Sequence, residues 1–138
     1  MSRTLAIDHG TKRMGIAISD ELKMIAQPLE YIPAEPLEKF WEALGVIIQE
    51  KDVDQMVVGM PRNMNGTYGP AAEKVKVFVA GLREHFPDIP VRTWDERLTS
   101  SQANRLLIEA DVRRDKRKEK VDKMAAAIIL QSYLDAIA

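Results

Sequence analysis

The beginning of the chain constrains the fold most strongly, because three strand-like apolar segments follow one another with only short turns between them. These segments cover residues 4–8, 15–19 and 23–32. Connections this short do not allow a crossover, so consecutive strands are expected to pair antiparallel as hairpins. The third segment is interrupted by Pro28, which cannot donate a hydrogen bond to a sheet and therefore favours an edge position.

The hydrophobic period changes after this meander. From Pro36 onward, apolar residues recur at helical spacing, and a short apolar run then predicts a buried strand. Thr99 and Gln102 match a capping box and predict another helix start. The expected elements after the meander are a helix from 36, a strand at 54–60, a helix from 70, a strand at 90–97, a helix from 99 to about 110 and a helix from about 120 to 136.

This order, β-β-β-α-β-α-β-α-α, predicts an α/β fold in which a mixed five-stranded sheet carries helices on both faces. The length of 138 residues suits one domain covering 1–138. No apolar run reaches the ~18 residues that a membrane span needs. Cysteine is absent, which excludes disulfides and thiolate metal sites and is compatible with a cytoplasmic location.

Charge is distributed unevenly along the chain. Residues 113–120, RRDKRKEK, hold six basic and two acidic side chains, so this segment carries +4 while the whole chain carries −1. Such a segment predicts either contact with a polyanion or an exposed basic loop without a binding role. Because like charges repel and few apolar side chains anchor them, residues 113–118 are expected to be mobile in the free protein.

Carboxylates fall at the ends of three expected elements. Asp8 ends the first strand, and Asp95 and Glu96 end the last. Asp122 lies in the first turn of the last helix, before three alanines. The carboxyl ends of strands line the functional crevice of such a sheet, and the first and last strands can lie side by side at its centre. Strand alternation then lets only one of Asp95 and Glu96 join Asp8, and the converging carboxylates would hold Mg²⁺ or Mn²⁺.

Each acid also has an explanation that involves no catalysis. Asp8 could make a turn hydrogen bond. Asp95 or Glu96 could be an exposed acid at a strand end, and Asp122 could stabilise a helix N-terminus through the helix dipole. The residues alone leave these alternatives open.

Four stretches carry a resemblance to a known family: LAIDHGTKRMGIAISD, VVGMPRNMNGT, DERLTS and KVDKMAAAIILQSYL. In order and spacing they resemble the motifs of the YqgF family of Holliday-junction-resolvase-like pre-16S rRNA nucleases. The resemblance covers essentially the whole chain. It implies an RNase H-like fold, which agrees with the element order above.

Carried over by position, the resemblance assigns a catalytic, metal-binding triad to Asp8, Glu96 and Asp122. It therefore favours Glu96 over Asp95. Two divalent ions, Mg²⁺ or Mn²⁺, would activate water and stabilise the leaving oxygen in phosphodiester hydrolysis. His9 receives no catalytic role.

The basic segment resembles the family's flexible basic loop, which implies substrate contact there, and the loop after residue 60 is predicted to contact the substrate near the metal ions. The expected substrate-binding residues are Arg62, Asn63, Asn65, Arg113, Arg114, Arg117 and Lys118. Gly59, Pro61 and Gly66 are expected to be structural. For the loop, the alternative is a turn whose asparagine and glycine residues only satisfy backbone geometry.

The sequence is compatible with four functions. The first is a metal-dependent nuclease that processes the 5′ end of precursor 16S rRNA in ribosome biogenesis. The second is a Holliday junction resolvase acting on DNA, which would need two active sites in a dimer, whereas the sequence is compatible with a monomer or a weak homodimer. The third is an ATPase-like phosphate-binding module, which would need a second related domain. The fourth is a non-catalytic RNA-binding protein of the same fold.

Overall fold

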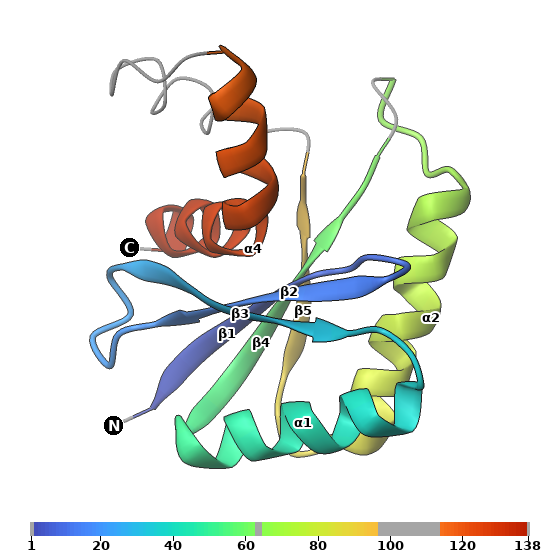
Figure 1. The fold of residues 1–138 in the computed structure, drawn as a ribbon. Helices are drawn as coiled ribbons and strands as arrows, with labels where there is room; N and C mark the ends of the chain where they lie inside the picture. The colour runs from blue at the N-terminus through green and yellow to red at the C-terminus, as the bar shows by residue number, and fades with distance from the viewer. Residues whose placement is uncertain (1, 63–64, 97–113, 138) are drawn as a thin grey trace.

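The computed structural model describes the backbone of residues 2–62, 65–96 and 114–137, and the side chains of these ranges except for 114–123. The described elements alternate between strands and helices after an initial meander (Figure 1). They are β1 (Arg3–Asp8), β2 (Arg13–Ser19), β3 (Ala26–Pro33), α1 (Leu37–Glu50), β4 (Val53–Met60), α2 (Pro70–His85), β5 (Val91–Asp95) and α4 (Arg114–Ile137).

The five strands form one mixed sheet in the order β3-β2-β1-β4-β5. β1 pairs antiparallel with β2, and β2 pairs antiparallel with β3, so the predicted hairpin meander is confirmed. β4 lies parallel to both β1 and β5. Pro28 is in β3 at the sheet edge, where its missing N–H costs no ladder hydrogen bond.

Helices cover both faces of the sheet, as predicted, with α1 and α2 on one face and α4 on the other (Figure 1). Alternation along β1 divides its side chains between the two layers. Leu5 and Ile7 pack with Phe40 of α1 and Leu82 of α2, all of them fully buried. Ala6 faces the α4 layer.

Hydrogen bonds fix α4 against its face of the sheet. The Tyr133 hydroxyl accepts from Gln55 Nε2 at 2.7 Å, and Trp94 Nε1 donates to Ser132 Oγ at 3.0 Å. Gln131 accepts from the backbone N–H of Ala26 at 2.8 Å. These partners come from three different strands. The hydrogen bonds therefore fix where α4 lies along the sheet, whereas apolar packing alone fixes only which face of the helix is buried.

Two sequence expectations about element positions are wrong. The last helix begins at Arg114 and not near 120, so the loop expected over the basic segment is helical from 114 onward. Arginine, lysine and glutamate are good helix formers, and Glu119 and Lys123 have the i,i+4 spacing that supports a helix. The first and last strands do not lie side by side, because β4 pairs with both and separates them.

The helix expected from Thr99 to about 110 lies outside the described residues. Among the described helices, none is both long and apolar enough to cross a membrane.

Candidate active site

Asp8 is held at the carboxyl end of the central strand. Its backbone pairs with Gly15 of β2, and the preceding Ile7 pairs with Val58 of β4. The strand is flanked by partners on both sides, so the carboxylate stands on a rigid support. Asp8 follows Ala6 on the sheet face covered by α4.

Glu96 follows the last residue of β5 and reaches Asp8 across the intervening strand. Its backbone N–H donates to the carbonyl of Met60 at 3.2 Å, which ties it to the end of β4. Its side chain makes a hydrogen bond with the Asp8 carboxyl group, although β4 separates the two parent strands. We call Asp8 and Glu96 the acid pair.

Gly59 makes this contact possible. A Cβ atom built on Gly59 would collide with the Glu96 carboxyl oxygen and with Ile129 Cδ1 of α4. Glycine at this position of β4 therefore leaves the space that the Glu96 side chain occupies on its way to Asp8. The sequence motif marked Gly59 as structural, and its structural role is to provide this opening.

Burial and proximity disfavour a negative charge on both members of the acid pair at once. Burial raises the pKa of Glu96 to about 7, and the negative charge of Asp8, its hydrogen bond to Asp8 and the charge of Asp95 add to the effect. Two carboxyl groups that share a hydrogen bond must hold a proton between them, since two carboxylates only accept. The pair offers carboxylate oxygens, which are the ligands that hard divalent cations such as Mg²⁺ and Mn²⁺ prefer.

Asp95 has a different environment from Glu96. Its Oδ2 lies 3.6 Å from Nη1 of Arg62, so it forms an ion pair with the loop after β4. Asp95 thus adds negative potential at Glu96 without being its hydrogen-bond partner. The two neighbouring acids therefore have different partners, Arg62 for Asp95 and Asp8 for Glu96. This difference agrees with their expected placement on opposite faces of the strand.

Asp122 belongs to α4, but its side chain lies outside the described part of the chain. The helix backbone puts it four residues, or about one turn, before Ala126. A Cβ built on Gly15 would lie 3.5 Å from Asp8 Cβ and 3.7 Å from Ala126 Cβ, so Asp8 and Ala126 both lie beside Gly15. Within the described residues no three metal-ligating side chains gather, and the third member of the triad stays a prediction.

The loop between β4 and α2 is organised by its own contacts. Arg62 donates from Nε and Nη2 to the carbonyl of Gly66, at 3.1 and 2.7 Å, and its guanidinium lies 4.7 Å from the Tyr68 ring centroid. Asn65 Oδ1 accepts from the backbone N–H and the hydroxyl of Thr67. Gly66 has φ of 87°, a value that favours glycine. These contacts serve the loop structure, and the predicted substrate contacts of Arg62 and Asn65 stay predictions, as does that of Asn63, which lies outside the described residues.

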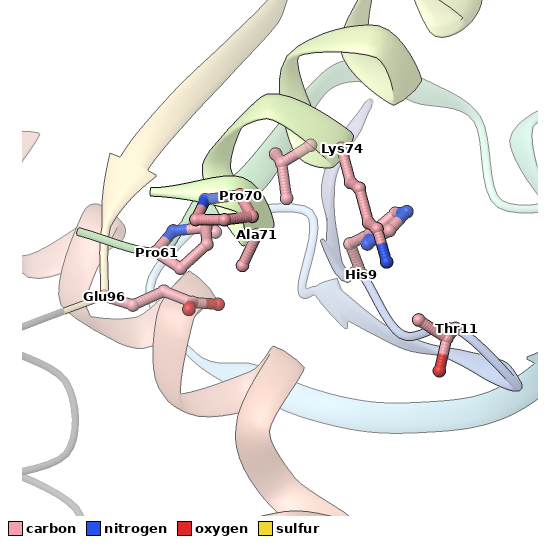
Figure 2. Close-up of a pocket in the computed structure, with 9 residues that line it drawn as sticks. His9, Thr11, Pro61, Pro70, Ala71, Lys74 and Glu96 are labelled. Atoms are coloured by element: carbon pink, nitrogen blue, oxygen red, sulfur yellow. The ribbon is translucent and has the colours of Figure 1, made fainter. Parts of the chain in front are cut away.

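A cavity of about 300 Å³ opens beside Glu96 (Figure 2). We call it the α2 cavity; its polar lining comes from His9, Thr11, Lys74 and Glu96. The His9 ring packs on Phe78 with 5.1 Å between ring centroids, and burial, followed by the charge of Lys74, lowers the pKa of His9. Sequence reasoning missed Thr11 and Lys74, because a turn threonine and one lysine among several on an amphipathic helix carry no distinctive signal.

The sheet order and the helices on both faces define the fold class: an RNase H-like architecture, which solved RuvC-type structures share. The structure superposes on Thermus thermophilus RuvC in complex with a Holliday junction substrate, with a TM-score of 0.56, 13% identity, and coverage of 99% of this chain and 95% of that one. The fowlpox virus resolvase gives a TM-score of 0.52 at 12% identity, with 98% of each chain covered. At these identities the likeness concerns the fold.

The sequence defines the particular family. The profile of the family described as RuvX, Holliday junction resolvase, matches residues 2–136, and the chain belongs to this family. Two similar relatives carry the name "Putative pre-16S rRNA nuclease". The one from Geobacillus kaustophilus is 54% identical over 97% of this chain and 98% of its own length. The one from Desulforamulus reducens is 49% identical, with 97% of each covered.

Proposed function

We propose that this chain, as one nuclease domain over 1–138, is a metal-dependent hydrolase that cleaves phosphodiester bonds in structured nucleic acid. The acid pair carries the proposal. Two carboxyl groups in hydrogen-bond contact at the carboxyl ends of strands, with the pKa of Glu96 at about 7, form a site that lacks one positive charge. No structural need of the sheet explains such a pair, because burying two acids together disfavours their charged forms.

The residues of this chain have separate tasks in the reaction. Asp8 and Glu96, with Asp122 of α4, would hold one or two divalent ions, Mg²⁺ or Mn²⁺, and the rigid sheet fixes the first two carboxylates relative to each other. When bound, such ions supply an activated water and stabilise the leaving oxygen. Because the pKa of Glu96 lies near neutrality, its carboxyl group gives up its proton readily when a cation enters.

Precursor 16S rRNA is the proposed substrate, with processing of its 5′ end in ribosome biogenesis and a cytoplasmic location. The relatives that bear the pre-16S rRNA name cover nearly the whole chain at about half identity, which supports the same substrate class here. Arg62, Asn63 and Asn65 are proposed to face the substrate near the acid pair. The ion pair between Arg62 and Asp95 puts this loop close to Glu96, which supports that placement.

A basic face of α4 is the second proposed substrate contact. Arg114, Arg117 and Lys118 have i,i+3 and i,i+4 spacing in the helix, and Arg113 immediately precedes it. Positions 118, 122 and 126 follow one another at four-residue intervals, so a strand bound along the first turns would lead to Asp122 and the acid pair.

Resolution of branched DNA is the second candidate function, because the family description names a Holliday junction resolvase. A strict resolvase needs two active sites in a symmetric dimer, whereas the proposed rRNA nuclease works as a monomer or weak homodimer. The two candidates share the acid pair and differ in assembly and substrate.

The testing experiment is a cleavage assay with Mg²⁺ or Mn²⁺ on precursor 16S rRNA and on a four-way DNA junction in parallel. Wild type is expected to cleave the RNA, and Asp8→Asn, which is nearly isosteric, to lose activity by about 100-fold or more. Cleavage of the junction alone, together with a dimer in solution, would favour the resolvase. Full activity of Asp8→Asn would contradict the catalytic proposal for both substrates.

A further inference from the structure

The α2 cavity adjoins the proposed active site, because Glu96 of the acid pair and the neighbouring Gly59 both line it. Figure 2 shows three polar side chains around it on the side away from Glu96: His9 and Thr11 from the turn after β1, and Lys74 from the beginning of α2. The Lys74 side chain extends from the helix toward the His9 ring. The cavity thus has an acidic end and a basic end.

Lys74 is available for a ligand. In the part of the chain that the structure describes, no carboxylate forms an ion pair with it. Lys76, two residues further along α2, differs in this respect, because its Nζ lies 3.3 Å from Glu73 Oε1 and 4.5 Å from the Tyr68 ring centroid. Lys76 does not line the cavity. Lys76 is therefore a suitable control position for substitutions of Lys74.

We propose that the α2 cavity binds the backbone phosphate of a nucleotide that flanks the cleaved bond, with Lys74 as its binding residue and the Thr11 hydroxyl as a second donor. This inference rests on the proposed nuclease function and extends it, since it assigns a second phosphate position to the substrate. Neither Lys74 nor Thr11 belongs to the acidic triad or to the basic segment.

The charges of the cavity determine the order of the two phosphates. Glu96 repels an anion unless a divalent ion lies between them, so the cleaved phosphate belongs at the acidic end. The neighbouring phosphate belongs at the Lys74 end, where a compact ammonium group and the positive end of α2 both attract an anion. A volume of about 300 Å³ is at the lower end of ligand sites, which suits one sugar-phosphate unit rather than a paired segment.

The first test compares the salt dependence of binding for wild type, Lys74→Gln and the control Lys76→Gln, using single-stranded RNA in EDTA. Loss of one phosphate contact should flatten the log–log slope of Lys74→Gln by about 0.7 and weaken binding about 3- to 5-fold at physiological salt. Lys74→Arg should keep most of the slope, since it keeps the charge. Lys76→Gln should match wild type.

The second test locates the phosphate by replacing single linkages of the RNA with neutral methylphosphonates. In wild type, one linkage next to the cleavage site should weaken binding when neutralised, and in Lys74→Gln the same replacement should have no further effect. Equal sensitivity of wild type and Lys74→Gln at every linkage, or equal salt slopes for Lys74→Gln and Lys76→Gln, would overturn the inference while wild type still binds and cleaves. If wild type neither binds nor cleaves RNA or a DNA junction, the proposed nuclease function fails and this inference fails with it.

Discussion

Gly59 is the residue on which the geometry of the acid pair depends most. It lies in β4, between β1, which ends at Asp8, and β5, which is followed by Glu96, and any side chain there occupies the space of the Glu96 carboxyl group. Gly59→Ala should therefore displace Glu96 from Asp8 and lower cleavage by about 100-fold, as small misplacements at active sites do.

The matched control for Gly59→Ala is Gly45→Ala on α1. A Cβ at Gly45 meets only the Phe86 ring edge at 3.7 Å, an ordinary contact, and the position is remote from the acid pair. Cleavage by Gly45→Ala should equal that of wild type. If Gly59→Ala cleaves at the wild-type rate, the contact between the Glu96 and Asp8 side chains across β4 is not needed for cleavage.

The raised pKa of Glu96 predicts a pH-dependent stability in the absence of divalent metal. The pKa rises from 4.5 to about 7 on folding, so the folded state binds the proton more tightly than the unfolded chain. The resulting stabilisation is complete below pH 4.5 and is lost as the pH rises toward 7. The free energy of unfolding of wild type, relative to Glu96→Gln, should fall by up to about 3 kcal/mol over this window.

Urea unfolding of both proteins in EDTA at pH 4.5, 6 and 7.5 measures this difference. The comparison with Glu96→Gln removes the contributions of other acids, such as Asp20 and Asp54, whose pKa values are lowered and which act at more acidic pH. A difference between the two proteins that does not change with pH would contradict the buried, proton-sharing pair.

Among the elements, α4 is the one that the proposed function assigns to both substrate binding and the metal site. Its C-terminal half is packed on the sheet through Leu130, Tyr133 and Leu134, and its first turns carry the basic residues. Replacing Arg113, Arg114, Arg117 and Lys118 with Gln keeps good helix formers and removes four charges. If most of these charges contact phosphate, the salt slope of RNA binding should flatten by about 2–3 units.

The rate of cleavage at saturating RNA should change much less in this variant, because the acid pair is untouched. Gln replacements of Lys39 and Lys51, on the opposite side of the sheet at the two ends of α1, provide the control. If the salt slope of RNA binding equals that of wild type, the four replaced basic residues are solvated and take no part in binding.

At the scale of the whole molecule, the sequence predicted the meander, the two crossover units and the edge position of β3, because hydrophobic period and proline act locally. It did not predict that β4 separates β1 from β5, since sheet order depends on long-range pairing. For the same reason the opening at Gly59 was not evident: a glycine in a strand does not reveal which side chain crosses it. The sequence did not single out Lys74, because the cavity that it lines is formed by segments that are far apart in the sequence.

The same dependence on long-range structure explains why the local sequence did not show which of Asp95 and Glu96 pairs with Asp8. Only the resemblance to a known family favoured Glu96. Both are acids at a strand end, and only the fold shows that one pairs with Arg62 and the other with Asp8.

The central claim is tested most directly by the single-turnover cleavage rates of Asp95→Asn and Glu96→Gln on precursor 16S rRNA with saturating Mg²⁺ or Mn²⁺. We expect Glu96→Gln to lose activity by about 100-fold or more. Adding Asp8→Asn to it should cause little further loss, because the two residues act as one site. Asp95→Asn, which removes an ion pair but no member of the acid pair, should stay within about 10-fold of wild type. An active Glu96→Gln together with an inactive Asp95→Asn would contradict the assignment of Glu96 to the active site.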